Sequence, residues 1–99
     1  MLKKRIFVSY SHLDEEWKEK VITHLKVIEA ESNIMIWDDR KIAAGEDWLP
    51  EIEKQIALAS VALLLLSANY LTSNFIIRKE VPAILRRRKK EGFVVIQLY

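Results

Sequence analysis

The 99-residue sequence predicts one α/β domain with a flavodoxin-like parallel sheet between two layers of helices. Short apolar runs alternate along the chain with segments of helical periodicity, which is typical of repeated strand–helix–strand units. The run 61–66 is apolar at every position, as expected for a strand buried on both faces of a sheet. Because the length fits one domain rather than two, we expect residues 1–99 to form a single unit.

The first strand and helix are predicted within residues 6–28. Ile6–Val8 favours a strand, and polar residues end it from Ser9 onward. Ser11 followed by Asp14 matches a capping box in which Asp14 reaches back to the start of the helix. Apolar residues then recur at helical spacing and predict the buried stripe: Leu13, Trp17, Val21, Leu25 and Ile28.

The second strand is predicted at 34–37, with Trp37 packed within the sheet. A charged loop follows from Asp38, and Asp47 can cap the next helix, whose first turn tolerates Pro50. The buried side of that helix would hold four residues: Trp48, Ile52, Ile56 and Ala59.

The third helix is predicted from about residue 74 to residue 90, with a kink or local break at Pro82, and Gly92 ends it. Residues 93–99 begin a fourth strand. Glu80 falls on the margin of an apolar stripe in this helix, which comprises Ile77, Val81, Ile84 and Leu85. Composition alone favours a solvated glutamate at that margin, whereas its place in the fold favours a role in a site.

Ligands bind such sheets at the carboxyl ends of the strands, where the winding reverses. Here Ser11 and His12 follow the first strand, residues 67–75 follow the third, and the 38–47 loop follows the second. Glu80 lies a turn or two into the third helix. We therefore expect these polar segments to converge on one cleft.

Composition excludes several classes of function. Without cysteine there is no disulfide framework, thiolate metal site or cysteine nucleophile, and with only His12 and His24 we expect no metal site. A net charge of +2 argues against a nucleic-acid partner, and we interpret the basic run 86–90 as a solvated helix end, with an acidic or phosphate-bearing partner as the alternative. Without a Gly-rich phosphate loop, a signal peptide or a membrane-length segment, we expect a cytoplasmic protein without membrane contact.

Several motifs together resemble a Toll/interleukin-1 receptor (TIR) domain of the bacterial type, over essentially the whole chain. These are Phe7–His12 with Asp14, Trp37–Arg40 with 42–45, Leu63–Ser67 with Ser73, and Glu80-Val81. The resemblance implies the TIR fold, with residues 38–47 matching the mobile loop after the second strand. It also implies that the chain is truncated, because the family continues past the fourth strand with another strand and helix; otherwise the sheet ends early and exposes 94–98 as an edge.

The resemblance implies an NAD⁺ nucleosidase that cleaves the nicotinamide–ribose bond, uses NAD⁺ as substrate and needs no cofactor. Glu80 matches the essential glutamate of the active members. By the same resemblance the NAD⁺-binding residues would be Ser11, His12, Asp38, Trp48, Ser67 and Phe75. The chain departs from several active members in having Ile76 where they carry an aromatic residue one helical turn before the glutamate.

In this interpretation the enzyme acts in signalling or defence and is activated by self-association. Two alternatives remain open. One is a non-catalytic TIR adaptor that binds other TIR domains through the 38–47 loop and its helix faces. The other is a small-nucleotide-binding module without turnover.

Overall fold

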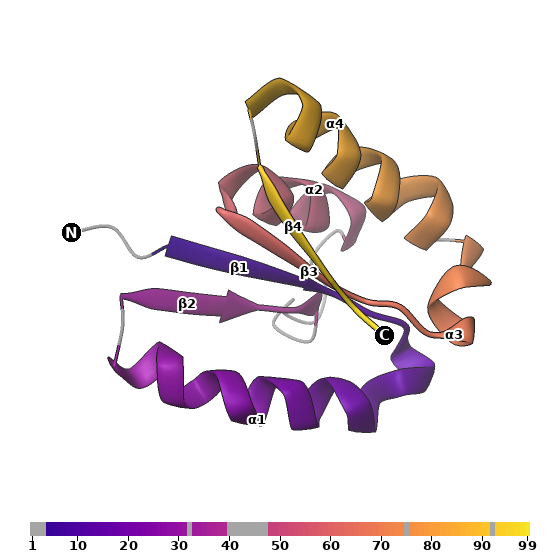
Figure 1. Cartoon of the computed structure of the whole chain (residues 1–99). Coiled ribbons are helices and arrows are strands. Elements are labelled where there is room, and N and C mark those ends of the chain that lie inside the picture. The colour runs from indigo at the N-terminus through magenta and orange to yellow at the C-terminus, as the bar shows by residue number, and fades with distance from the viewer. Residues whose placement is uncertain (1–3, 32, 40–47, 75, 92) are drawn as a thin grey trace.

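The computed structural model describes residues 4–31, 33–39, 48–74, 76–91 and 93–99 (Figure 1). Its strands are β1 (Lys4–Ser9), β2 (Ile34–Trp37), β3 (Val61–Leu65) and β4 (Val94–Leu98). They form one parallel sheet in the order β2-β1-β3-β4, which confirms the predicted flavodoxin-like fold with β1 and β3 as neighbours. The carboxyl ends of β1 and β3 therefore meet at one edge of the sheet.

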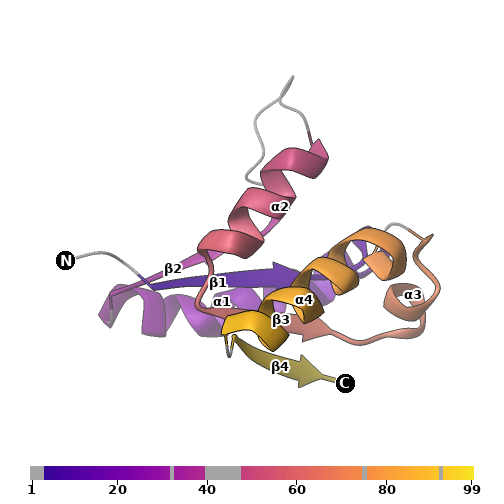
Figure 2. The ribbon, with the colours of Figure 1, turned by 90° about the horizontal axis from the view of Figure 1, so that it is seen from above.

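Helices cover both faces of the sheet, as Figures 1 and 2 show. α1 (Glu15–Glu31) lies on one face and is preceded by the short 3-10 helix η1 (His12–Asp14). The other face carries α2 (Trp48–Leu58) and the helix formed by the π-helical turn η3 (Ile76–Glu80) and α4 (Val81–Glu91). The short α3 (Ala68–Leu71), which the sequence pattern did not predict, connects β3 to η3.

The core has one apolar cluster on each face of the sheet. Because side chains alternate along a strand, Ala62 and Leu64 of β3 join the cluster under α2 and α4, whereas Leu63 and Leu65 join the cluster under α1. All four are buried, which confirms the prediction of a strand covered on both faces. Trp37 is buried and stacks on Phe7 with ring centroids 5.4 Å apart, as the prediction of strand packing requires.

The predicted helix faces are confirmed in part. Ile52, Ile56 and Ala59 are buried beneath α2, and Trp17 is half-buried against the cluster under α1. Leu13 and Ile28, predicted in the α1 stripe, are exposed.

The capping box is only half formed. Ser11 caps η1 by accepting a hydrogen bond from the backbone N–H of Leu13 at 3.3 Å. The Asp14 carboxylate is instead engaged by Ser67 and Asn69, which ties the start of α1 to the start of α3.

The helix irregularity predicted at Pro82 is present as η3, the π-helical turn that ends at Glu80 just before it. A π turn contains more residues than an α turn, so it rotates the side chains that precede it relative to those that follow. As a result Ile76, Glu80 and Ile84 are buried, while Ile77 and Leu85 are exposed. The prediction of an apolar stripe through Ile77 and Leu85 was therefore wrong, and Glu80 lies inside the molecule rather than on a margin.

The basic run at the end of α4 is solvated at four of its five positions. The exception is Arg87, whose guanidinium donates to the carbonyl oxygens of Ile56, at 2.7 Å, and Ala59. Since these carbonyls lie at the carboxyl end of α2, Arg87 caps that helix from its neighbour. It also lies 4.4 Å from the ring centroid of Phe93.

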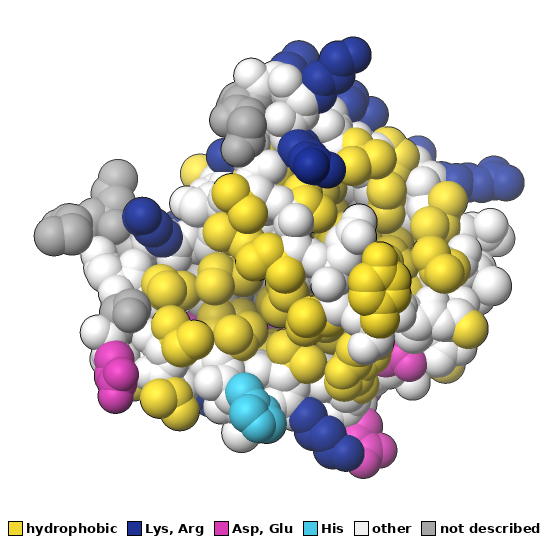
Figure 3. All heavy atoms as spheres, in the orientation of Figure 1, with side chains coloured by type: hydrophobic (Ala, Val, Ile, Leu, Met, Phe, Trp, Pro, Cys, Tyr) yellow, Lys and Arg dark blue, Asp and Glu magenta, His cyan; other side chains and the backbone are white. Residues whose placement is uncertain are grey.

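β4 forms an edge of the sheet in the described residues, with Val94 and Ile96 about half exposed. Apolar side chains gather over β4 and toward α1 in Figure 3. They border a shallow hollow whose apolar lining includes Trp17, Val21, Leu25, Ile96 and Leu98. In the described part of the chain, no helix is both long and apolar enough to cross a bilayer.

Candidate active site

A cavity of about 360 Å³ opens at the carboxyl ends of the strands, between η1, α3 and η3. Its polar lining comes from segments far apart in the sequence and includes Ser11, His12, Asp39, Asn69, Thr72, Ser73 and Glu80. Three of the predicted site residues, Ser11, His12 and Glu80, are thus brought together at the predicted edge of the sheet.

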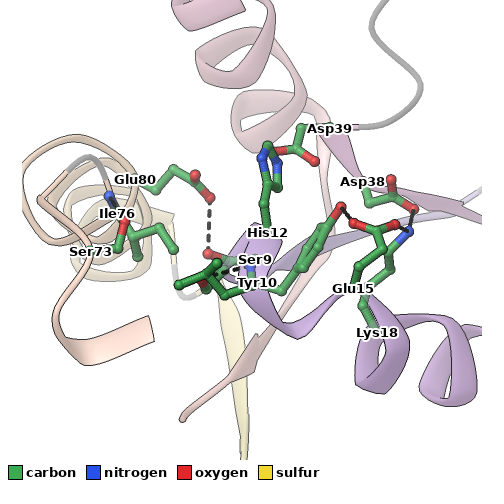
Figure 4. Close-up of polar contacts among 12 residues, drawn as sticks. Ser9, Tyr10, His12, Glu15, Lys18, Asp38, Asp39, Ser73, Ile76 and Glu80 are labelled. Carbon is green, nitrogen blue, oxygen red and sulfur yellow. Dashed lines mark hydrogen bonds and ion pairs between the residues drawn. The ribbon is translucent and has the colours of Figure 1, made fainter. Parts of the chain in front are cut away.

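Glu80 lies at the wall of this cavity and is only 4% exposed. The π turn directs its side chain toward the sheet, where the Ser9 hydroxyl donates a hydrogen bond of 2.9 Å to Oε1 (Figure 4). Ser9 is the last residue of β1 and alternates with Phe7, so it lies on the face that η3 covers. The sheet thereby holds the carboxyl group in one position.

Tyr70 extends this hydrogen-bond network. Its hydroxyl lies 2.9 Å from the Ser9 oxygen, and both side chains are 1% exposed. When Glu80 is ionised, Ser9 gives its one hydroxyl proton to it, so Tyr70 donates its own proton to Ser9. The network therefore runs in one direction, from Tyr70 through Ser9 to Glu80.

Burial raises the pKa of Glu80 to about 7, against a smaller opposing contribution from the Ser9 hydrogen bond and with a further increase from the charge of Asp39. Burial likewise raises the pKa of Tyr70 to about 12, so this phenol stays protonated as a donor at physiological pH. A carboxyl group with a pKa near neutrality inside a cavity is typical of functional sites.

Asp39 and His12 form the opposite wall. The Nε2 atom of His12 lies 2.6 Å from Oδ2 of Asp39, and the His12 ring packs 5.5 Å from the Tyr10 ring. The His12 side chain is 49% exposed, whereas that of Asp39 is 9% exposed. The other oxygen of Asp39, Oδ1, is buried and has no hydrogen-bond partner among the described residues.

Asp38 does not line the cavity. It is buried on the α1 side of the sheet, 3.7 Å from the ammonium nitrogen of Lys18. Lys18 is itself buried and also pairs with Glu15 at 2.8 Å and Glu19 at 2.5 Å. Burial acts to lower the pKa of Lys18, but these acids together raise it. Lys18 is therefore protonated and pairs with Asp38 as a cation.

Ser67, predicted to bind NAD⁺, also lies outside the cavity lining. Its hydroxyl caps α3 by accepting from the Tyr70 backbone N–H at 3.0 Å, and it donates to Asp14. This is a structural role at the start of α3. Phe75 and the side chain of Trp48 lie outside the described residues, so the roles expected of them stay predictions.

The sequence analysis missed Ser9, Tyr70 and Asp39. Ser9 and Asp39 each lie two positions beyond a residue of the core under α2 and α4, namely Phe7 and Trp37. Strand alternation would have selected Ser9, and extending the same period past the end of β2 would have selected Asp39, had the face covered by the third helix been known. Tyr70 carried no such signal because α3 was not predicted. Among the described residues, no three acidic or histidine side chains come together as a metal site.

Comparisons with known proteins agree with the fold. A family model for the TIR domain matches residues 6–99. The uncharacterized protein y4lF of Sinorhizobium fredii (strain NBRC 101917 / NGR234) is 31% identical over 93 residues, which is 94% of this chain and 29% of that protein. The chain thus spans less than a third of the length of this relative.

A solved structure, the TIR domains of the activated Roq1 resistosome directly recognizing the pathogen effector XopQ, is also similar. It matches with a TM-score of 0.74 and 24% sequence identity, over 96% of this chain and 56% of that chain. At this identity the likeness shows the fold. From the family match over residues 6–99, together with this fold, we conclude that the chain belongs to the TIR domain family.

Proposed function

We propose that this TIR domain is an NAD⁺ nucleosidase that cleaves the bond between nicotinamide and ribose, with Glu80 as the catalytic carboxylate. The observation that carries the proposal is the buried Glu80 at the cavity wall, which Ser9 orients by a hydrogen bond and whose pKa burial raises to about 7. Catalytic carboxyl groups are commonly tuned to this range by burial.

The reaction suits a site with one such acid. In NAD⁺ the nicotinamide is a cationic pyridinium ring, and it leaves as a neutral molecule. Its departure therefore needs no general acid, in contrast to glycoside hydrolysis, which uses two carboxyl groups. The electron pair of the glycosidic bond goes to the ring nitrogen, and positive charge develops on the ribose. Ionised Glu80 stabilises that charge, and water then adds to the ribose carbon with loss of a proton, giving ADP-ribose.

The electrostatics of the cavity favour this substrate. A pyridinium cation in the cavity stabilises the ionised form of Glu80 and so lowers its pKa on binding. A volume of about 360 Å³ is near the lower end of ligand sites, which suits the nicotinamide riboside half of NAD⁺ rather than the whole dinucleotide. We assign Ser11 and His12, which line the cavity, to the ribose or the adjoining phosphate.

We also propose that activity depends on self-association, as the resemblance to signalling TIR domains implies. The structural likeness to TIR domains of a resistosome supports this proposal. Conformational closure that completes a site is a known way of gating an enzyme, and in this proposal assembly has the same effect by ordering the 38–47 loop.

The test is nicotinamide release from NAD⁺ over a range of protein concentrations. We expect release that rises more steeply than protein concentration, and a loss on the order of 100- to 1,000-fold in Glu80→Gln. Glu16→Gln is the matched control, because it makes the same change on a side chain that is 88% exposed. Equal release by wild type and Glu80→Gln would place the site elsewhere, and no release by folded, assembled protein would indicate a TIR adaptor.

A further inference from the structure

We propose that Asp39 is a second substrate-binding carboxylate, whose Oδ1 accepts a hydrogen bond from an O–H or N–H group of the nicotinamide riboside half of the substrate. This inference rests on the proposed function and assigns a partner to the wall of the cavity opposite Glu80.

The unpaired oxygen of Asp39 carries the inference. The side chain is 9% exposed, Oδ2 is held by His12 at 2.6 Å, and Oδ1 is buried without a partner among the described residues. Leaving a buried charged acceptor unpaired is costly, so native structures seldom do it without a reason. Since Asp39 lines the cavity, a bound molecule can supply the missing donor once the carboxylate turns to expose Oδ1, which is closed to solvent in the unliganded chain.

The protein holds this carboxylate in place before any ligand binds. Asp38 and Asp39 follow the end of β2 at Trp37, and their side chains lie on opposite sides of the sheet. Lys18 anchors Asp38 on the α1 side, and Asp39 therefore points toward the side of Glu80, as Figure 4 shows. His12 holds Oδ2 of Asp39, so the carboxylate has only to turn about this contact to present Oδ1 to a ligand.

The charge of the cavity selects the part of the substrate that enters it. Ionised carboxylates accept hydrogen bonds and donate none. Asp39 and Glu80 line the same cavity and interact electrostatically, so a phosphate placed between them would be repelled. Ribose hydroxyls and the carboxamide N–H are donors, and the pyridinium ring is a cation. The nicotinamide riboside half therefore fits between these two carboxylates, and the pyrophosphate stays out of that space.

The experiment measures binding by calorimetry in the Glu80→Gln protein, so that turnover does not interfere. Asp39→Ala removes the acceptor, Asp39→Asn keeps its volume in case the alanine variant does not fold, and Glu16→Gln is the charge control. The ligands are nicotinamide riboside, its 2′-deoxy and 3′-deoxy analogues, and the 3-acetylpyridine analogue, which lacks the carboxamide N–H.

We expect Asp39→Ala to weaken nicotinamide riboside about 10- to 100-fold, as for loss of a hydrogen bond to a charged group. Asp39→Asn should weaken it less, and Glu16→Gln should leave it unchanged. One analogue should bind the Asp39 variants as well as nicotinamide riboside does, which identifies the donor as a hydroxyl or as the carboxamide. A purely structural role of Asp39 would instead weaken every ligand equally.

Equal weakening of every ligand, or no weakening of any, would overturn the assignment of Asp39. In both cases nicotinamide release by the wild type would still support the proposed function. If NAD⁺ neither binds nor is cleaved, the assignment and the proposed function both fail.

Discussion

Glu80→Gln should make the protein more stable at neutral pH and leave its stability at pH 4.5 almost unchanged. Burial raises the pKa of Glu80 from its ordinary 4.5 to about 7 in the folded chain. Between these values the unfolded chain has lost a proton that the folded chain retains, so the free energy of unfolding falls as pH rises. Each unit of difference between the folded and unfolded pKa values corresponds to 1.36 kcal/mol, so by pH 8 the free energy of unfolding of the wild type is lower by about 3 kcal/mol. Glutamine cannot ionise, and it keeps an oxygen that can accept from Ser9.

Urea denaturation of the wild type and Glu80→Gln at pH 4.5 and pH 8 measures this difference. By thermal unfolding, 3 kcal/mol corresponds to a rise of very roughly 10 to 20 °C in a domain of this size. Glu16→Gln should follow the wild type at both values, because its side chain is 88% exposed. A stability difference between wild type and Glu80→Gln that is the same at both pH values would refute the reasoning, since Glu80 would then titrate alike in the folded and unfolded chains.

Two further variants test the contacts that position the site and the fold. Ser9→Ala should raise the pKa of Glu80 by about 1 to 2 further pH units, because it removes a hydrogen-bond donor that stabilises the ionised carboxylate by roughly 1.5 to 3 kcal/mol. Carbon-13 NMR titration of labelled glutamate measures this pKa. An unchanged pKa would contradict the role given to Ser9. Arg87→Ala should lower the free energy of unfolding by about 2 kcal/mol or more, because it leaves two carbonyls at the end of α2 without their charged donor. Arg88 is exposed, so Arg88→Ala should change the free energy of unfolding by less than about 0.5 kcal/mol in the same urea denaturation. Equal effects of Arg87→Ala and Arg88→Ala would count against the capping role of Arg87.

The edge of the sheet that carries the candidate site was predictable from the sequence. Four apolar runs separated by helical patterns restrict the chain to a parallel sheet, and polar residues follow those runs. Since parallel strands end at the same edge, Ser11, His12 and Glu80 could be expected in one cleft, and they line one cavity.

The faces that individual side chains take were harder to predict. Asp38 and Asp39 are the same residue type at adjacent positions, and only the structure shows that the first pairs with Lys18 while the second lines the cavity. Likewise a π turn cannot be read from periodicity, because periodicity assumes a constant number of residues per turn. That turn buries Glu80, which the constant-period pattern had left on a margin.

The sequence by itself determined the strand–helix order, the buried third strand and the end of the sheet where polar residues gather, because these depend on local patterns of apolar and polar residues. Only the tertiary structure decided the direction and the protonation of Glu80. Both depend on contacts between distant residues, since Ser9 lies 71 positions from Glu80 and 61 from Tyr70. Burial, which raises the pKa of Glu80, likewise exists only once the helix has packed against the sheet.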